Sequence, residues 1–374
     1  MAWTCNRNGS FLSLIGLLSA VIAITACSAS IAPQQPQAHP TAATLSSTTA
    51  SRGTASPAGS TTGTGSTGST TGTTGTNSNA KSALHEPTTL LPLPGTRTYP
   101  GEGVWQPAGR PVAGKSAVYE TMLVPPGGTA RAGIAWMDTH LLSARLYSGS
   151  MSPGGGPYRY TAPVARTAAR SLVAAFNGGF QMKDAHGGYY TEGRMIRPLV
   201  RGGASLVIYA NGSVTIGAWG SDVTMTPSVV SVRQNLYPLV VNGRPSTLAS
   251  TRDWLLWGGT CPCGKGQHGY ENQWRSGLGV TADGALVYVV GPKLAPFQVA
   301  ALLVRAGAVS GMQLDINPTW PVFASFKPAT PDGLAAPSNG ARLIATYRGP
   351  ATFFDPTYAR DFITMSARPV EGSR

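Results

Sequence analysis

The chain has 374 residues and a formal net charge of +13, because its 28 Lys and Arg residues outnumber its 15 Asp and Glu residues. Only Arg7, Arg52 and Lys81 precede residue 84, so the C-terminal part is basic too and favours anionic partners. It lacks a run of Lys and Arg interleaved with aromatic residues, so we expect no nucleic-acid partner. Walker, Rossmann, His-Glu-x-x-His and Gly-x-Ser-x-Gly motifs are absent as well, and we predict no cofactor.

The N-terminus carries the pattern of an export signal. Arg7 precedes an apolar run at 11–23 that is too short to span a bilayer but suits a signal peptide. The run ends in Ile24-Thr25-Ala26-Cys27, which resembles a bacterial lipobox and predicts a lipoprotein signal peptide at 1–26 with lipidation of Cys27. A plain secretory signal and an uncleaved anchor are the alternatives. The lipobox predicts a protein that is lipid-anchored at the extracytoplasmic face of the cell membrane.

The rest of the chain divides into a tether and a domain. Ser, Thr, Gly, Pro and Ala dominate residues 27–97, and such a segment offers too little apolar surface to offset its chain entropy. We therefore expect 27–97 to be disordered. Residues 98–374 have a globular composition without a second linker or a long-period repeat, which predicts a single domain.

Strand patterns dominate the predicted domain. Helical patterns are sparse: one begins at Pro296 and ends at Gly307, and a weaker one covers Pro163 to Ser171. Many strands with a few helices predict an α+β fold, with a mixed β-sheet and a few packed helices. The predicted strands are Ala117–Val124, Gly133–Met137, Leu142–Tyr147, Leu172–Phe176, Ser205–Tyr209, Val214–Trp219, Leu239–Val241, Ala285–Val290, Met312–Leu314, Val322–Phe326 and Leu343–Tyr347.

Two cysteines remain in the predicted domain. Cys261 and Cys263 flank one proline, and we expect a local disulfide between them. With His268 they could instead form part of a zinc site, but a fourth ligand is not evident in the sequence. We therefore predict no metal.

A polar turn after a buried strand is the first candidate site. The run Leu172–Phe176 leads into Asn177, Gly178 and Gly179, where glycines permit a close backbone approach and the amide both donates and accepts hydrogen bonds. An ordinary strand-exit turn is the alternative. A second signal is Asp315, one of few acids in the chain, which directly follows the predicted strand Met312–Leu314.

These segments resemble a known family. Leu172 to Phe180 is similar to the Asn-Gly-Gly-Phe signature of the phosphodiester glycosidase domain family, which includes the uncovering enzyme that removes N-acetylglucosamine from a sugar phosphodiester. Further blocks match in the family's order over about residues 115–347. They are Arg233-Gln234-Asn235-Leu236, Leu239-Val240-Val241-Asn242-Gly243, Arg275-Ser276-Gly277-Leu278-Gly279-Val280, and Asp283 to Val290 followed by the helix and Asp315. The resemblance implies a hydrolase that acts on sugar-1-phosphodiesters.

The resemblance also suggests roles for the candidate residues. Asp315 would be the nucleophile or base, because glycosidic cleavage needs a carboxylate near the anomeric carbon. Arg275 would hold the phosphate through its guanidinium, and Asn177 with the Gly178 and Gly179 backbone would bind sugar hydroxyls or phosphate oxygens. Each has a structural alternative: Arg275 could pair with an acid, and Asp315 could cap the loop that follows it.

Three further candidates complete the predicted site. Glu192 is the candidate for a second catalytic carboxylate, with a solvated loop position as the alternative. The family usually has three glycines and hydroxyl residues after the Asp, whereas this chain has Ile316-Asn317-Pro318-Thr319-Trp320. Asn317 and Trp320 are therefore candidate substrate contacts, Trp320 as a stacking face for a sugar.

Taken together, the sequence predicts a surface-anchored phosphodiester glycosidase. Its predicted partner is an anionic surface glycopolymer or a sugar phosphodiester of the cell wall, and its membrane contact is the N-terminal lipid. A non-catalytic wall-glycan or phosphopolymer binder with the same fold is the main alternative. A scaffold partner of a wall-synthesis complex is a third, which would carry an exposed apolar patch instead of a polar pocket.

Overall fold

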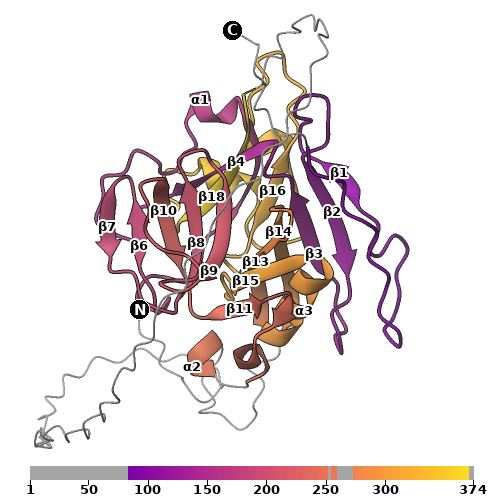
Figure 1. The fold of residues 1–374 in the computed structure, drawn as a ribbon. Coiled ribbons are helices and arrows are strands. Elements are labelled where there is room, and N and C mark those ends of the chain that lie inside the picture. The colour runs from indigo at the N-terminus through magenta and orange to yellow at the C-terminus, as the bar shows by residue number, and fades with distance from the viewer. Residues whose placement is uncertain (1–82, 252–253, 259–272, 370–374) are drawn as a thin grey trace, which may run out of the picture. The chain divides into compact units, whose positions relative to one another are not determined.

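The computed structural model describes residues 83–251, 254–258 and 273–369. All of them lie in one compact unit, drawn in colour in Figure 1. Strands make up 37% and helices 10% of this structure. The predicted α+β class is therefore wrong: the fold is mostly β, built from three sheets in which every named strand pair is antiparallel.

The largest sheet has eight strands, in the order β1-β2-β3-β14-β13-β15-β11-β12. Their bounds are β1, Gln106–Ala108; β2, Val118–Leu123; β3, Ala132–Met137; β11, Pro238–Val241; β12, Arg244–Pro245; β13, Gln273–Thr281; β14, Leu286–Leu294; and β15, Ala308–Gln313. Two five-stranded sheets accompany it, in the orders β7-β6-β10-β8-β9 and β17-β16-β5-β18-β4. Their bounds are β4, Leu142–Tyr147; β5, Leu172–Asn177; β6, Tyr189–Thr191; β7, Arg194–Arg197; β8, Ala204–Tyr209; β9, Val214–Ala218; β10, Val229–Gln234; β16, Phe323–Phe326; β17, Gly340–Arg342; and β18, Phe362–Ala367.

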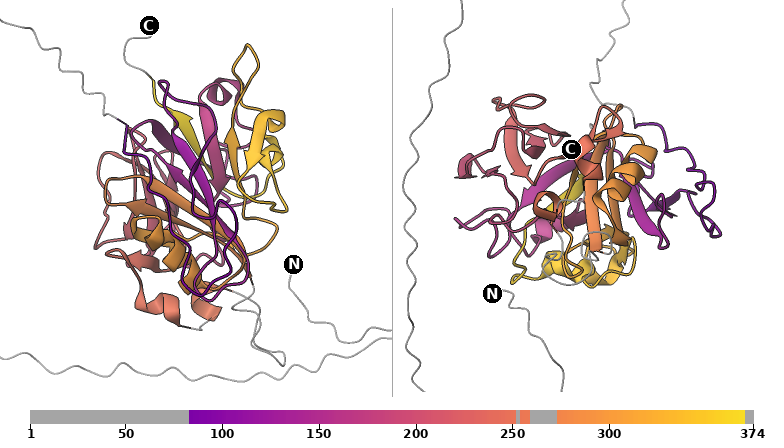
Figure 2. Two further views of the ribbon diagram at one scale, coloured as in Figure 1. Left: turned by 90° about the vertical axis from the view of Figure 1, so that its right-hand side faces the viewer. Right: turned by 90° about the horizontal axis from the view of Figure 1, so that it is seen from below.

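Helices are short and few in the described residues. The helix predicted from Pro296 is confirmed as α3, Pro296–Arg305, and it packs against β13, β14 and β15 (Figure 2). The segment predicted as helical from Pro163 forms only the single turn α1, Arg166–Ala169. The remaining helices are α2, Trp254–Trp257, and the 3₁₀ turns η1, Thr247–Ser250; η2, Pro337–Asn339; and η3, Pro350–Phe354. None of the described helices has the length and apolar character needed to cross a membrane.

An aromatic cluster packs the large sheet against the sheet that contains β5. The rings of Phe176, Tyr288 and Phe323 come from β5, β14 and β16, and their centroids lie 5.3 Å to 6.2 Å apart. All three side chains are buried, so this contact excludes water from between the two sheets. It also fixes the C-terminal end of β5 beside the large sheet, where the candidate site lies.

Contacts with the domain begin before residue 98, where the domain was predicted to start. The backbone amide of Leu84 donates to Asp138 Oδ2 at 2.8 Å, and the indole of Trp105 donates to the Thr88 carbonyl at 2.9 Å. The Leu90 amide also donates to the Gly103 carbonyl, at 2.9 Å, so contacts with the domain recur between Leu84 and Leu90. Near the C-terminus, the predicted strand Leu343–Tyr347 is not formed. The short strand β17 ends just before it, at Arg342.

Candidate functional site

Two of the predicted site residues meet at the junction of two sheets. Asn177 ends β5, and Asp315 follows β15 in the large sheet. Ser276 of β13 lies between them: its hydroxyl oxygen accepts from Asn177 Nδ2 at 3.1 Å and from the Asp315 backbone amide at 3.1 Å. The polar turn and the acid, far apart in the sequence, therefore share one hydrogen-bonding partner.

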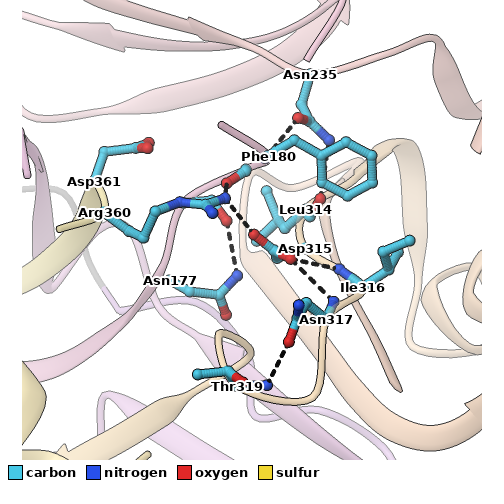
Figure 3. Close-up of polar contacts among 12 residues, drawn as sticks. Asn177, Phe180, Asn235, Leu314, Asp315, Ile316, Asn317, Thr319, Arg360 and Asp361 are labelled. Carbon is cyan, nitrogen blue, oxygen red and sulfur yellow. Dashed lines mark hydrogen bonds and ion pairs between the residues drawn. The ribbon is translucent and has the colours of Figure 1, made fainter. Parts of the chain in front are cut away.

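Arg360 joins the turn to the acid directly. One of its terminal nitrogens, Nη2, donates to the Gly179 carbonyl at 2.8 Å and to Asp315 Oδ2 at 2.5 Å. Both charged side chains are almost completely buried, with Arg360 5% and Asp315 3% exposed. Figure 3 shows the Asp315 carboxylate between the Arg360 guanidinium and the backbone of residues 316 and 317.

The Asp315 carboxylate carries two kinds of bond. Oδ2 binds Arg360, while Oδ1 accepts the backbone amides of Ile316 at 2.8 Å and Asn317 at 3.1 Å. Asp315 therefore caps the following loop, as its structural alternative predicted. Burial raises the pKa of Asp315 above the ordinary carboxyl value, while Arg360 and the two amides oppose that rise. A carboxyl group in this setting exchanges a proton closer to neutral pH than an exposed one does.

The two glycines of the turn are required by packing against polar side chains. A Cβ on Gly178 would lie 2.1 Å from Asp361 Oδ2, and a Cβ on Gly179 would lie 2.6 Å from Asn235 Oδ1. Neither glycine is among those with positive φ, so close approach rather than a left-handed backbone explains them. The groups that approach the two glycines are Asp361 and Asn235, which belong to the protein's own buried polar network.

That network is built around a second ion pair. Arg233 of β10 binds Asp361 through Nε at 2.8 Å and Nη2 at 3.2 Å, with both side chains buried. Asn235 accepts the Phe180 amide at 2.9 Å and donates to the carbonyls of Gln313 and Leu314. The sheet that contains β10 thus supports the turn through this buried polar network.

Sequence reasoning missed Arg360 and Asp361. The signal that could have found them is an Arg-Asp pair directly before the strand Phe362–Ala367, which parallels the position of Asp315 directly after a strand. Arg233 and Asn235 were part of a block that resembled the family, but no role had been predicted for either.

Asn177 has no spare hydrogen-bonding capacity. Its Oδ1 accepts from the Tyr288 hydroxyl at 2.7 Å and from the Val322 amide at 3.1 Å, and its Nδ2 donates to Ser276 and to the Gly178 carbonyl. An amide side chain offers two donors and two acceptor positions, so all four are used. Substrate contact by Asn177 stays a prediction, and it would require an existing bond to break.

Arg275 binds the protein interior. It is fully buried, and its guanidinium donates to the carbonyls of Leu294 at 2.7 Å and Trp257 at 3.0 Å and to Gln313 Oε1 at 2.8 Å. Because successive side chains of a strand point to opposite faces and Ser276 faces Asp315, Arg275 faces the other way. The structure therefore does not bring Arg275 to the Asp315 carboxylate.

Glu192 also lies apart from Asp315. It follows β6 in a tight turn, and its carboxylate accepts the backbone amides of Arg159 at 3.0 Å and Tyr160 at 2.9 Å. It lines a cavity of about 410 Å³ together with Arg145 and Tyr160, and Asp315 is not among the lining residues. The second carboxylate that the sequence suggested is thus not brought to the first.

The loop after Asp315 does lie at the site. Asn317 is exposed, and its side-chain oxygen accepts the Thr319 amide at 3.0 Å. The half-buried Trp320 ring already has cationic neighbours, because the guanidinium carbons of Arg348 and Arg360 lie 4.7 Å and 4.9 Å from its centroid. The stacking face predicted for a sugar is therefore at least partly engaged by arginine.

Three predicted residues lie outside the described part of the chain. They are Cys27, Cys261 and Cys263, so the lipidation and the disulfide stay predictions. Among the described residues, no group of three or more His, Cys, Asp and Glu side chains is placed to hold a metal ion.

Comparisons with known proteins find only distant similarities. No family model and no curated protein matches the chain. One solved structure is the zebrafish N-acetylglucosamine-1-phosphodiester alpha-N-acetylglucosaminidase catalytic domain, auto-inhibited by its pro-peptide, at TM-score 0.42 and 16% identity over 71% of this chain and 88% of that one. A hypothetical protein from Synechocystis aligns at TM-score 0.38 and 12% identity, over 70% of this chain and 64% of that one. A putative exported protein from Burkholderia pseudomallei aligns at TM-score 0.32 and 15% identity, over 64% of this chain and 74% of that one. These values describe a distant relationship of fold.

Proposed function

We propose that this protein hydrolyses a sugar-1-phosphodiester at Asp315. The observation that supports the proposal is the position of Arg360, which binds both the Asp315 carboxylate and the carbonyl of Gly179. It connects the two segments whose sequences resemble the phosphodiester glycosidase family into one site. A buried carboxyl group beside a cation, with its pKa raised by burial, is the kind of group that transfers protons in catalysis.

The chemistry needs one base and a site for the leaving group. Water attacks the anomeric carbon, the bond from C1 to the phosphate oxygen breaks, and the phosphate monoester leaves with the electron pair. Asp315 accepts the proton of the attacking water. A phosphate is a good leaving group without protonation, so a general acid is less necessary here than in ordinary glycosidases, which use two carboxylates.

The substrate and the location follow from the sequence predictions. With lipidation at Cys27 and a tether behind it, the domain would work at the extracytoplasmic face of the membrane. The substrate would then be a phosphodiester-linked sugar of a wall or surface glycopolymer, in keeping with the net charge of +13.

A non-catalytic binder of the same glycopolymers is the second candidate. Two observations favour it: Glu192, the predicted second acid, lines a separate cavity, and Asn177 is fully bonded within the protein. A site with one carboxylate that is itself ion-paired can hold a ligand without cleaving it.

The test is release of free sugar from a panel of sugar-1-phosphodiesters by the wild-type protein and by Asp315→Asn. We expect release by the wild type and a loss of about 100-fold or more in the variant, the scale of a general-base contribution. Asp332→Asn is the matched control, because Asp332 is an exposed acid paired with Arg166 at 3.3 Å. Release that is equal in wild type and Asp315→Asn would refute the role of Asp315, and binding without release from any substrate would favour the second candidate.

A further inference from the structure

We propose that Arg348, Tyr358 and Arg360, grouped around Trp320, bind the phosphate of the substrate. The inference rests on the proposed function for the identity of the ligand, a phosphodiester monoanion attached to a sugar. Its structural basis is independent of catalysis: a cluster of cationic and hydroxyl groups in which three buried polar atoms make no hydrogen bond within the described structure.

The four side chains form one cluster. The guanidinium carbon of Arg348 lies 4.7 Å from the Trp320 ring centroid and 5.2 Å from that of Tyr358. The guanidinium carbon of Arg360 lies 4.9 Å from the Trp320 centroid, and the two aromatic rings are 6.2 Å apart. Trp320 follows the strand-end acid, while the other three come from the C-terminal segment before β18.

Several polar atoms of this cluster are buried without a partner. Across the described part of the chain, Arg348 Nε, Arg360 Nε and the Tyr358 hydroxyl are buried and make no hydrogen bond. Tyr358 is 1% exposed and Arg360 5%. Unsatisfied buried donors are rare in native proteins because each one loses its hydration without a replacement. Three of them around one tryptophan indicate a place that an acceptor occupies.

The charges of the cluster favour an anion as that acceptor. Arg360 is paired with Asp315, whereas the Arg348 side chain has no hydrogen bond or ion pair among the described residues; only its backbone carbonyl is bonded, by the Thr346 hydroxyl. The neighbouring acid Asp355 interacts with Arg348 through its charge but forms no ion pair with it in the described structure, and its Oδ1 accepts the amide of Thr357 at 2.8 Å and its hydroxyl at 2.6 Å. Guanidinium groups and a hydroxyl are the donors that phosphate oxygens accept from most strongly.

The position suits the leaving group of the proposed reaction. Because Arg360 belongs to the cluster and also binds Asp315 Oδ2, a phosphate held there would lie beside the carboxylate. Arg275, the phosphate ligand expected from the sequence, faces the opposite side of β13 and binds carbonyls there. The cluster thus supplies the anion site that Arg275 does not.

The experiment is calorimetric titration of the full-length protein with dimethyl phosphate, which carries the anion without the sugar, and with methyl glucoside, which carries the sugar without the anion. Arg348→Gln is expected to weaken dimethyl phosphate binding about tenfold, the effect of one lost charge-assisted hydrogen bond. The matched control is Arg145→Gln, because Arg145 is another arginine stacked on an aromatic ring, at 4.1 Å from the Tyr160 centroid. Thermal unfolding establishes that each variant is folded.

The outcomes separate this site from the proposed reaction. Equal affinity in wild type and Arg348→Gln, or equal weakening in Arg145→Gln, would overturn the proposal. If Arg348→Gln does not fold, Tyr358→Phe decides, with an expected weakening of about threefold and refutation if affinity is unchanged. Asp315→Asn should bind dimethyl phosphate at least as tightly as wild type because it removes a negative charge. An absence of sugar release combined with intact dimethyl phosphate binding would reject the hydrolase and retain the anion site.

Discussion

Replacing Gly178 by alanine tests why the polar turn contains glycine. The added methyl group would lie 2.1 Å from Oδ2 and 2.6 Å from Cγ of Asp361, and 2.8 Å from the backbone oxygen of the same residue. The side chain of Asp361 is held by Arg233 at 2.8 Å and cannot move without breaking a buried ion pair. The backbone oxygen is fixed as well, because it accepts the Gly178 amide at 2.9 Å.

The magnitude follows from these two constraints. Overpacking of a close-packed interior costs about 1–3 kcal/mol. Separation of a buried ion pair costs about 3–5 kcal/mol when one partner is lost. Since side-chain movement alone does not relieve the backbone contact, we expect Gly178→Ala to lower the free energy of unfolding by about 4 kcal/mol, or Tm by roughly 10 °C. The control is Gly156→Ala, where the nearest atom would lie at an ordinary 3.5 Å, and we expect a loss within about 1 kcal/mol.

Urea unfolding followed by circular dichroism measures both variants against wild type. The reasoning fails if Gly178→Ala is as stable as Gly156→Ala. If Gly178→Ala were stable and yet lost all sugar release, the glycine would serve the approach of a ligand instead of the packing of Asp361.

Three other predictions concern pH, a buried amide and the domain boundary. Since burial raises the pKa of Asp315 and Arg360 opposes that rise, activity that needs the carboxylate should increase with pH through a midpoint above the ordinary value of 3.8, and Arg360→Met should move the midpoint of kcat/KM higher still. Gln234→Ala should lower the free energy of unfolding, measured in urea, by about 3 kcal/mol. The Gln234 side chain bonds both backbone groups of Val200, the Gly188 amide and the Ser205 hydroxyl at 2.7 Å to 3.0 Å. A loss below about 1 kcal/mol would contradict this. A chain that begins at residue 98 should have a lower Tm than one that begins at residue 83, because it lacks the bond from the Leu84 amide to Asp138; equal Tm values would show that these contacts add no stability.

Local pattern predicted individual elements better than their assembly. The helix Pro296–Arg305 was found because proline begins it and glycine follows its end, and the apolar runs of β3, β5 and β8 were found as strands. The strand Gln273–Thr281 was missed: its arginine, serine and glycines interrupt the apolar pattern, although most of it is buried in the middle of the large sheet. Tertiary pairing, which local sequence does not encode, makes this segment a strand.

The fold class was wrong because a few helical patterns among many strands were taken to indicate an α+β fold with a mixed sheet. A mixed sheet needs crossover helices, and α3 is the one long helix among the described residues. It connects β14 to β15 across β13, so even these two strands are not neighbours in the sheet. Short turns join other consecutive partners, such as β6 to β7 and β8 to β9, and short turns produce antiparallel pairs.

Position at a strand end indicated two residues of the candidate site, whereas partners from distant segments left no local signal. Asn177 ends β5 and Asp315 follows β15, and the structure brings both to Ser276. Arg275 and Glu192 were chosen for their charge, yet charge alone does not tell which face of a strand a side chain takes or which loop a carboxylate caps. The place of Arg360 in the site depends on its ion pair with Asp315, 45 residues away in the sequence, and no local pattern reveals such a contact.

The segment after Asp315 explains how the site differs from the family that its motifs resemble. Asp315 Oδ1 holds the amides of Ile316 and Asn317, Asn317 in turn holds Thr319, and the Trp320 amide donates to the Asn317 carbonyl at 2.9 Å. These polar side chains fix the loop without the glycines expected there. The loop ends by placing an aromatic ring against two guanidiniums, where the family's pattern would leave a small hydroxyl-bearing wall. A hydroxyl wall suits the neutral sugar, whereas a cationic wall suits the phosphate. If Arg348 and Arg360 bind the phosphate as proposed, the substitution shifts binding energy from the sugar to the anion, and sugars that differ only in a hydroxyl should be discriminated weakly as long as the phosphodiester is intact.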